Sequence, residues 1–127
     1  MKALVVDDVE INRELIAIFL EGRASVVCAE SGEEALALVK EALESNTYFD
    51  LICLDIFMPG MDGHETLKKI REMEAAFDGV RATVFMVTGS SCPDDMFDAL
   101  MGGGDDYLTK PLMQQSFNDL LGKHGLC

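Results

Sequence analysis

The sequence is poor in basic residues, and this shortage excludes several kinds of partner. Only 10 Lys and Arg residues stand against 23 Asp and Glu residues, which gives a formal net charge of −13 at pH 7. Nucleic acid and anionic membrane surfaces attract basic proteins and repel acidic ones. We therefore expect no direct contact with nucleic acid and no membrane partner.

Long apolar runs are missing as well. Every apolar run is far shorter than the roughly 20 residues needed to span a bilayer. The segment after Met1 turns acidic at Asp7, so it lacks the apolar stretch of a signal peptide. The 127 residues are still 49% hydrophobic, which is enough for one domain with a buried core. We expect a single cytoplasmic domain over residues 1–127.

Closely spaced cysteines are also missing. Cys28, Cys53, Cys92 and Cys127 have neither zinc-site nor thioredoxin-type spacing. Reduced thiols in a cytosolic protein are the simplest interpretation. Cys28 and Cys53 lie in apolar runs, which predicts small core residues, whereas Cys92 and Cys127 are expected to be more exposed.

Short apolar runs and helical patterns alternate five times along the chain. The apolar runs predict strands at 2–6, 24–29, 51–54, 82–87 and 106–109. Helical spacing of apolar residues predicts helices at about 11–20, 32–43, 64–76, 93–102 and 113–121, the second opened by a Ser31/Glu34 capping box. This alternation predicts an α/β fold, a single doubly wound sheet of five parallel strands covered by five helices.

Polar side chains follow the ends of these predicted strands. Asp7 and Asp8 follow the first strand, Asp55 the third, Thr88 the fourth and Lys110 the fifth. In an open α/β sheet, ligands bind outside the carboxyl ends of the strands, so these positions are expected to converge on one crevice. Each alone has a structural explanation, such as a helix cap for Asp8 or a solvated side chain for Lys110. Their joint placement is what indicates a functional site.

Three carboxylates in one crevice repel one another unless a cation lies between them. Their hard oxygen ligands suit Mg²⁺ or Mn²⁺. A divalent ion beside the Lys110 ammonium and the Thr88 hydroxyl suits a phosphoryl group. Asp55 is then a candidate nucleophile that attacks phosphorus and gives an aspartyl phosphate.

Four motifs, in this order, carry a family resemblance. They are Val5-Val6-Asp7-Asp8, the run LDIFMPGMDG over 54–63, Val87-Thr88-Gly89, and the run DDYLTKP over 105–111. Together they make the sequence resemble the receiver domain of bacterial two-component response regulators, the family typified by the chemotaxis protein CheY. The resemblance covers essentially the whole chain and implies a flavodoxin-like (βα)5 fold.

The resemblance also implies a role for each acidic residue. It makes Asp55 the phosphoacceptor, Asp8 a direct metal ligand, and Asp7 a ligand that acts mainly through water. The backbone carbonyl of Phe57 is implied as a third protein ligand of Mg²⁺ or Mn²⁺.

Further roles follow from the same resemblance. Thr88 is expected to bond a phosphoryl oxygen, and Lys110 to bond the acidic cluster or the phosphate. Thr88 and Tyr107 form a switch, in which the Tyr107 ring turns inward when Thr88 moves toward the phosphate. A half-buried aromatic with its hydroxyl in water is the alternative for Tyr107. The Lys110–Pro111 bond is expected to be cis.

Three positions depart from the family pattern. Gly89 stands where most members have Ala, and Leu112 where Phe is frequent. Phe57 stands where many members have a smaller or polar residue. We expect Gly89 to open access to Asp55, and Phe57 to exclude water and prolong the life of the phosphate.

The main hypothesis is a signalling switch rather than an enzyme. Asp55 takes a phosphoryl group from the phosphohistidine of a sensor histidine kinase or phosphotransfer protein, and the chain catalyses only its own phosphorylation and dephosphorylation. The face built from 93–102, 106–109 and the last helix then controls an output protein partner. The segment from Val9 to Leu15 resembles receivers attached to hybrid histidine kinases. A receiver module of a hybrid kinase, or of a longer response regulator, therefore remains an alternative.

Three other hypotheses differ in class. A haloacid-dehalogenase-type, Mg-dependent phosphatase also uses an Asp nucleophile, but it needs a second acid where Phe57 stands. A nucleotide-binding or flavodoxin-like module would need a Gly-rich phosphate loop after Val6, and none is present. A receiver-shaped domain that is never phosphorylated would not need all five polar groups.

Overall fold

The computed structural model describes residues 1–77, 80–89, 97–98 and 101–126. Strands and helices alternate along them in the order β1 (Lys2–Val6), α1 (Glu10–Phe19), β2 (Ser25–Ala29), α2 (Gly32–Glu44), β3 (Leu51–Asp55), α3 (Gly63–Glu74), β4 (Thr83–Thr88), β5 (Asp106–Thr109) and α5 (Gln114–Lys123). The helix predicted over 93–102 lies largely outside the described residues, although Phe97, Asp98 and Met101 are helical. None of the helices in the described part is long and apolar enough to cross a membrane.

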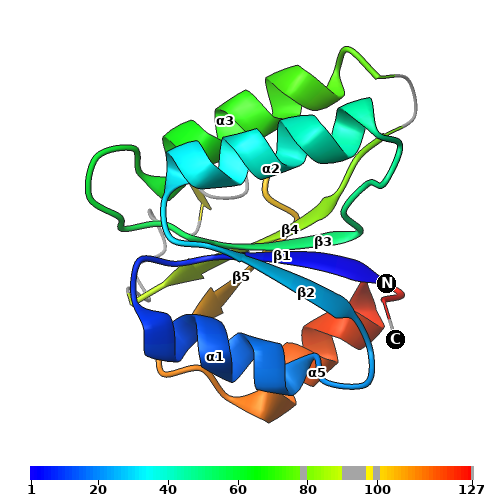
Figure 1. Cartoon of the computed structure of the whole chain (residues 1–127). Helices are drawn as coiled ribbons and strands as arrows, with labels where there is room; N and C mark the ends of the chain where they lie inside the picture. Colours follow the sequence, from blue (N-terminus) through cyan, green and yellow to red (C-terminus); the bar gives the residue numbers. More distant parts are fainter. Residues whose placement is uncertain (78–79, 90–96, 99–100, 127) are drawn as a thin grey trace.

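The five strands form one parallel sheet in the order β2-β1-β3-β4-β5. This confirms the predicted doubly wound sheet. α2 and α3 cover one face, and α1 and α5 cover the other (Figure 1). The strand order reverses between β1 and β3, and the crevice beyond the carboxyl ends of these two strands is where such sheets bind ligands.

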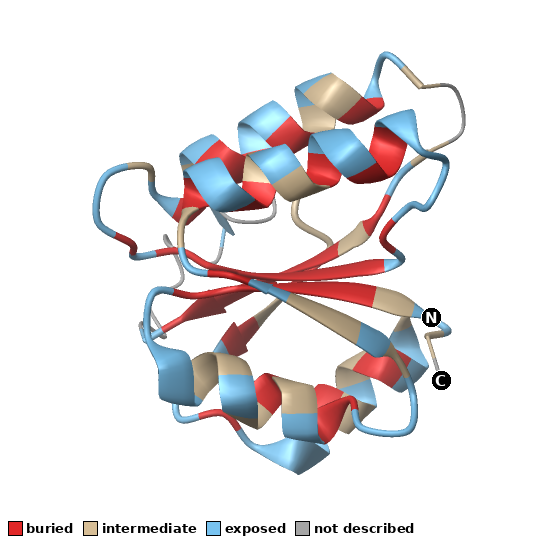
Figure 2. Cartoon of the chain, in the orientation of Figure 1, coloured by how far each residue is buried: buried red, intermediate tan, exposed pale blue. Residues whose placement is uncertain are grey.

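Two apolar clusters, one on each face, hold the layers together. Ile52 and Leu54 of β3 belong to the cluster under α2 and α3, whereas Leu51 and Cys53 belong to the cluster under α1 and α5. Every residue of β3 is buried, because this strand has neighbours on both sides and helices on both faces (Figure 2). A fully buried central strand gives Asp55, its last residue, a fixed position.

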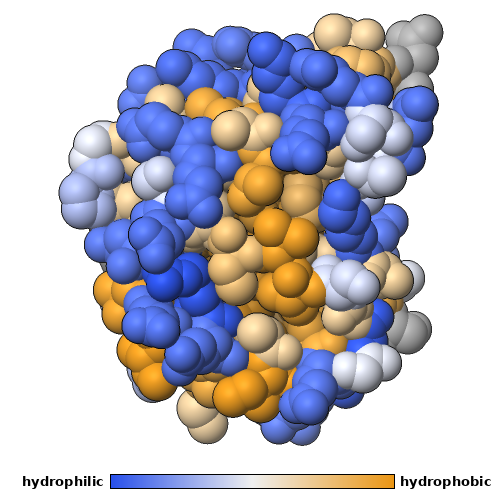
Figure 3. All heavy atoms as spheres, viewed as in Figure 1, coloured by the Kyte–Doolittle hydropathy of each residue, from blue (hydrophilic) through white to orange (hydrophobic). Residues whose placement is uncertain are grey.

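The edge strand β2 departs from the prediction. Cys28 is exposed, so its assignment to the core is wrong, whereas Cys53 is buried as predicted. The reason is that β2 pairs only with β1 and leaves its outer edge open. Figure 3 shows a band of apolar side chains across this side of the molecule. Cys92 and Cys127 lie outside the described residues.

The starts of two helices are set by side-chain caps. Ser31 caps α2, and its hydroxyl accepts a hydrogen bond from the Glu34 amide at 3.1 Å, as the capping signature predicts. α3 begins at Gly63 rather than His64, because the Asp62 carboxylate accepts the Glu65 amide at 2.9 Å. This cap fixes the end of the loop that follows Asp55.

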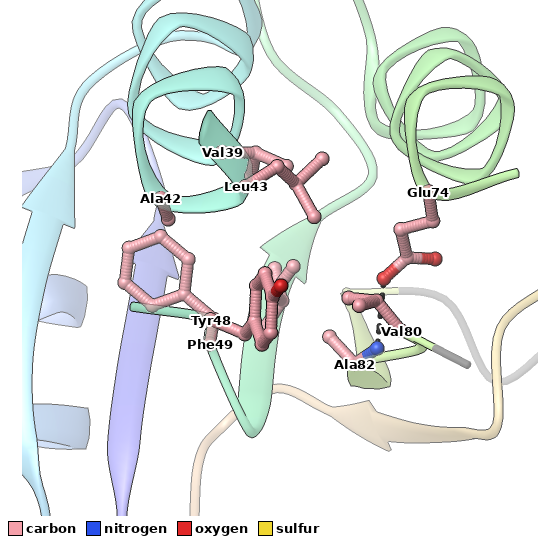
Figure 4. Close-up of a pocket in the computed structure, with 9 residues that line it drawn as sticks. Val39, Ala42, Leu43, Tyr48, Phe49, Glu74, Val80 and Ala82 are labelled. Atoms are coloured by element: carbon pink, nitrogen blue, oxygen red, sulfur yellow. Dashed lines mark hydrogen bonds between the residues drawn. The ribbon is translucent and has the colours of Figure 1, made fainter. Parts of the chain in front are cut away.

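A small pocket between α2, β3 and α3 is lined mainly by apolar side chains (Figure 4). Glu74 is its acidic member, and it is buried because its carboxylate accepts the Ala82 amide at 2.7 Å and the Arg71 guanidinium at 2.7 Å. The pocket lies toward the amino ends of β3 and β4, since Phe49 and Ala82 precede those strands. It is therefore separate from the carboxyl-end crevice.

Candidate functional site

Three carboxylates meet at the carboxyl ends of β1 and β3. One oxygen each from Asp7, Asp8 and Asp55 lies within 4.8 Å of the other two. Asp7 and Asp55 are buried, with exposed fractions of 1% and 2%, whereas Asp8 is exposed. β1 and β3 are adjacent in the sheet, so the residues at their ends are brought together as the sequence predicts.

The two oxygens of Asp7 have different surroundings. Oδ1 accepts a hydrogen bond from the Val9 amide at 2.9 Å, which holds the turn into α1. Oδ2 is buried and, within the part of the chain that the structure describes, accepts no hydrogen bond. A buried carboxylate oxygen without a donor is costly unless a cation neutralises it. Lys110 Nζ, at 3.5 Å, supplies part of that charge.

Lys110 links β5 to the acidic cluster. Its ammonium lies 3.4 Å from Asp55 Oδ1, and its side chain is 28% exposed. Its amide donates to the Thr88 carbonyl at 2.7 Å, and the Lys110–Pro111 peptide is cis, as expected. The ammonium therefore reaches the site from the strand end next to Thr88.

Burial raises the pKa of Asp55 to about 6, from its usual value of 3.8. The neighbouring charge of Asp7 and, more weakly, that of Asp8 act in the same direction, whereas Lys110 lowers the pKa through its charge and hydrogen bond. The ionised carboxylate is thus not fully compensated by the positive charge of Lys110. A bound divalent cation would restore that balance.

Thr88 and Tyr107 lie on the same face of the sheet. Thr88 is fully buried, and it has the same strand parity as Val84 and Met86, which pack under α2 and α3. Tyr107, opposite Met86, is partly buried against that same cluster. The two members of the expected switch therefore share one layer.

The three positions that depart from the family pattern differ in burial. Phe57 is 61% exposed, so most of its ring is in solvent, and its expected shielding of the site stays a prediction. A Cβ atom on Gly89 would meet nothing within 4 Å among the described atoms, which fits an open approach. Leu112 is buried against the α5 layer.

One contact at the site was missed by sequence reasoning. Arg13 Nη1 donates to the backbone carbonyl of Asp7 at 2.8 Å, and Nη2 lies 3.4 Å from Glu30 Oε1. An arginine in an amphipathic helix gives no periodic signal for such a contact. Its only local indication is that α1 follows Asp7 closely enough for the side chain to reach back.

The model of the response regulator receiver domain family matches residues 3–121. The chain belongs to this family. Receiver domains are signalling domains of two-component systems, so the family agrees with the non-enzyme hypothesis.

Two relatives and one solved structure define the similarity further. "Two-component response regulator ORR41" of Oryza sativa subsp. japonica is 35% identical over 129 residues, which cover 99% of this chain and 95% of that protein. "Hybrid signal transduction histidine kinase L" of Dictyostelium discoideum is 34% identical over 125 residues, 98% of this chain but 7% of that protein. The receiver domain of the histidine kinase CKI1 from Arabidopsis thaliana, complexed with Mg²⁺ and BeF₃⁻, has a TM-score of 0.82 at 32% identity, covering 98% and 89% of the two chains.

Proposed function

We propose that this domain is a phosphorylation-dependent switch in which Asp55 is the phosphoacceptor. The observation that carries the proposal is the meeting of the Asp7, Asp8 and Asp55 oxygens within 4.8 Å, with the Lys110 ammonium 3.4 Å from Asp55. Three carboxylates and one ammonium leave a net negative site that favours a divalent cation. Such a cation, together with Lys110, can then accept the negative charge of a phosphoryl group.

The residues fit Mg²⁺ or Mn²⁺. The donor set is made of hard carboxylate oxygens, and the buried Asp7 Oδ2 has no hydrogen-bond donor among the described residues. Asp8 and Asp55 would bind the ion directly, Asp7 mainly through water, and the Phe57 carbonyl as a further ligand. When bound, the ion would neutralise charge on the transferred group. The CKI1 receiver domain, which was solved as a complex with Mg²⁺, supports this assignment by similarity.

The proposed chemical step is the transfer of a phosphoryl group from a histidine nitrogen to an oxygen of Asp55. An Asp55 carboxylate oxygen forms a bond to phosphorus while the phosphorus–nitrogen bond of a phosphohistidine breaks. The electron pair of that bond stays on the imidazole nitrogen, and a proton on the other ring nitrogen lets the histidine leave as neutral imidazole. Lys110 stabilises the charge on the phosphoryl oxygens, and the Thr88 hydroxyl donates a hydrogen bond to one of them. Loss of phosphate to water restores the carboxylate.

A sensor histidine kinase or a phosphotransfer protein is the proposed donor, and a protein is the proposed output partner. The proposed output face includes β5 and α5, and Tyr107 of β5 lies in the same layer as Thr88. The charge of −13 disfavours direct contact with nucleic acid or an anionic membrane, and a cytoplasmic location is part of the proposal. Because the Dictyostelium relative is a hybrid kinase of which this chain spans 7%, a receiver module within a longer kinase or regulator is the second candidate.

The experiment is phosphorylation by acetyl phosphate with Mg²⁺, followed by intact-mass measurement and borohydride trapping. We expect one phosphoryl group in the wild type and none in Asp55→Asn. Asp62→Asn is the matched control, because it removes a nearby carboxylate but keeps a residue that can cap α3. Full labelling of Asp55→Asn, or loss of labelling in Asp62→Asn alone, would contradict the assignment.

A further inference from the structure

Arg13 connects three segments next to the acidic cluster. It lies in the first turns of α1, its side chain is 12% exposed, and its guanidinium reaches the Asp7 carbonyl after β1 and the Glu30 carboxylate after β2. The bond to Asp7 is short, at 2.8 Å, whereas Glu30 is 72% exposed and its contact is longer, at 3.4 Å. The contact with the Asp7 backbone is therefore the stronger of the two.

Asp7 is held through both of its peptide groups. Its amide donates to the Ala29 carbonyl at 3.1 Å, and its carbonyl accepts from Arg13. Its side chain is held as well, since Oδ1 accepts from the Val9 amide. With these three bonds in place, Oδ2 is left facing the site, and Asp8 is carried on the same short turn.

We infer that Arg13 is a positioning residue for the divalent cation site, which keeps the turn of Asp7 and Asp8 in the binding geometry. This rests on the proposed function, because it takes the acidic cluster as a metal site. α1 begins at Glu10, and its N-cap residue, Val9, offers no side-chain cap. The turn is therefore held from α1 by the Val9 amide bond to Asp7 Oδ1 and by the Arg13 bond to the Asp7 carbonyl. Bonds from the surrounding shell that orient metal ligands are worth about 10- to 100-fold in metal affinity.

Arg13 has two opposite effects on metal affinity, so the direction of the change in affinity shows which effect is larger. Its positive charge lies close to the cation site and repels the metal, so removing the charge alone would tighten binding. Its hydrogen bond orders the ligand turn, so removing the bond would weaken binding. If positioning dominates, Arg13→Met binds the metal more weakly although the site has become more negative.

Three variants separate these effects. Arg13→Met keeps the aliphatic stem and removes both the donor and the charge. Arg13→Lys keeps the charge and offers ammonium donors in place of the guanidinium, on a side chain one atom shorter. Glu30→Gln removes the exposed ion pair but leaves the bond to Asp7, and it serves as the matched control.

The measurement is Mg²⁺ affinity by titration calorimetry, with the free energy of unfolding measured by urea denaturation. We expect Arg13→Met to bind about tenfold more weakly, Arg13→Lys to recover part of that loss, and Glu30→Gln to stay within about twofold of the wild type. In the metal-free protein, the Val9 amide of Arg13→Met should also exchange faster with deuterium, whereas the Leu20 amide at the far end of α1 should not change. This second readout needs no metal and no phosphotransfer.

The outcomes are distinct. Wild-type protein that binds no Mg²⁺ would overturn the proposed metal site itself. Wild-type binding with equal or tighter binding by Arg13→Met would overturn the positioning role alone. Arg13→Lys that binds no better than Arg13→Met would also overturn it, because a donor at this position would then not be what holds the turn.

Discussion

Gly63, the first residue of α3, packs directly against the backbone of Asp55. Its amide donates to the Ile56 carbonyl at 2.8 Å, and a Cβ atom at this position would overlap the Asp55 carbonyl oxygen and come within 2.7 Å of the Ile56 Cα. The start of α3 thus approaches the end of β3 more closely than any side chain allows. Glycine is required here by close approach, since its backbone is helical.

Replacing Gly63 with Ala is therefore expected to destabilise the fold by about 1–3 kcal/mol. The atoms that the new Cβ would overlap belong to the backbone, which cannot move aside as easily as a flexible side chain. It should also weaken Mg²⁺ binding, since the strand that has to move carries Asp55. The matched control is Gly122→Ala in α5, where a Cβ atom would meet nothing within 4 Å among the described atoms. That control should be neutral or stabilising by up to about 1 kcal/mol. Urea denaturation of both variants checks the prediction, and equal stabilities would contradict it.

Much of this fold is predictable from the sequence because its signals are local. The strands at Lys2–Val6 and Asp106–Thr109 have the predicted bounds, since short apolar runs there have abrupt polar ends. The convergence of Asp7 and Asp55 also follows, because parallel strands place their carboxyl ends at one edge. Pattern and sheet topology were sufficient for these features.

Other features depend on tertiary contacts that periodicity does not contain. Glu74 is buried because Arg71 and the Ala82 amide satisfy it, and nothing in the spacing of α3 marks it as different from an exposed glutamate. Cys28 is exposed because β2 is an edge strand, which is a property of strand order rather than of its apolar run. The start of α3 was open to prediction, since Asp62 precedes Glu65 by the three residues of a capping signature.

The raised pKa of Asp55 predicts a pH-dependent stability. Between its unfolded value of 3.8 and its folded value of about 6, the folded protein holds this proton more tightly than the unfolded chain does. The free energy of unfolding should therefore fall as the pH rises through that window, and it should stay lower above it. Asp55→Asn removes this group, so at pH 7 to 8 without divalent metal we expect it to be more stable than the wild type by about 1–3 kcal/mol.

Urea denaturation at pH 3.5 and pH 7.5 tests this, with the difference between variant and wild type shrinking at the lower pH. Adding Mg²⁺ at the higher pH should stabilise the wild type more than Asp55→Asn, because the ion binds the ionised carboxylate. A variant that is less stable than the wild type at neutral pH would contradict the pKa of Asp55.

Lys110 is expected to hold the pKa of Asp55 down. Its charge and its hydrogen bond both lower that pKa, against the opposite effects of burial and Asp7. Lys110→Met keeps the length of the side chain and removes the charge, so the Asp55 pKa should rise further above about 6. The measurement is the ¹³C carboxyl shift of Asp55 as a function of pH. Lys123→Met is the control, since Lys123 pairs with Asp106 at 3.0 Å and should leave the titration of Asp55 unchanged.

The switch pair gives the last prediction. If the Thr88 hydroxyl bonds the phosphoryl group, Thr88→Val should keep the shape of this buried side chain but uncouple Tyr107 from the site. The sequence has no Trp and only two Tyr, so in a Tyr48→Phe background the tyrosine emission comes from Tyr107 alone. We expect BeF₃⁻ with Mg²⁺ to change that emission in the Tyr48→Phe protein, and to change it far less once Thr88→Val is added.

Thr109→Val is the matched control for this switch. Thr109 lies opposite Thr88 on β5 but is exposed, so the variant loses a hydroxyl of the same kind from the neighbouring strand without changing a buried side chain. When Thr109→Val is added to the Tyr48→Phe background, the change in tyrosine emission on adding BeF₃⁻ should equal that of the Tyr48→Phe parent. Calorimetry with Mg²⁺ alone should give similar affinities for all three proteins, because the proposed metal ligands are unchanged. An emission change that survives in Thr88→Val, with BeF₃⁻ still bound, would separate Tyr107 from Thr88 and leave it as a half-buried edge aromatic.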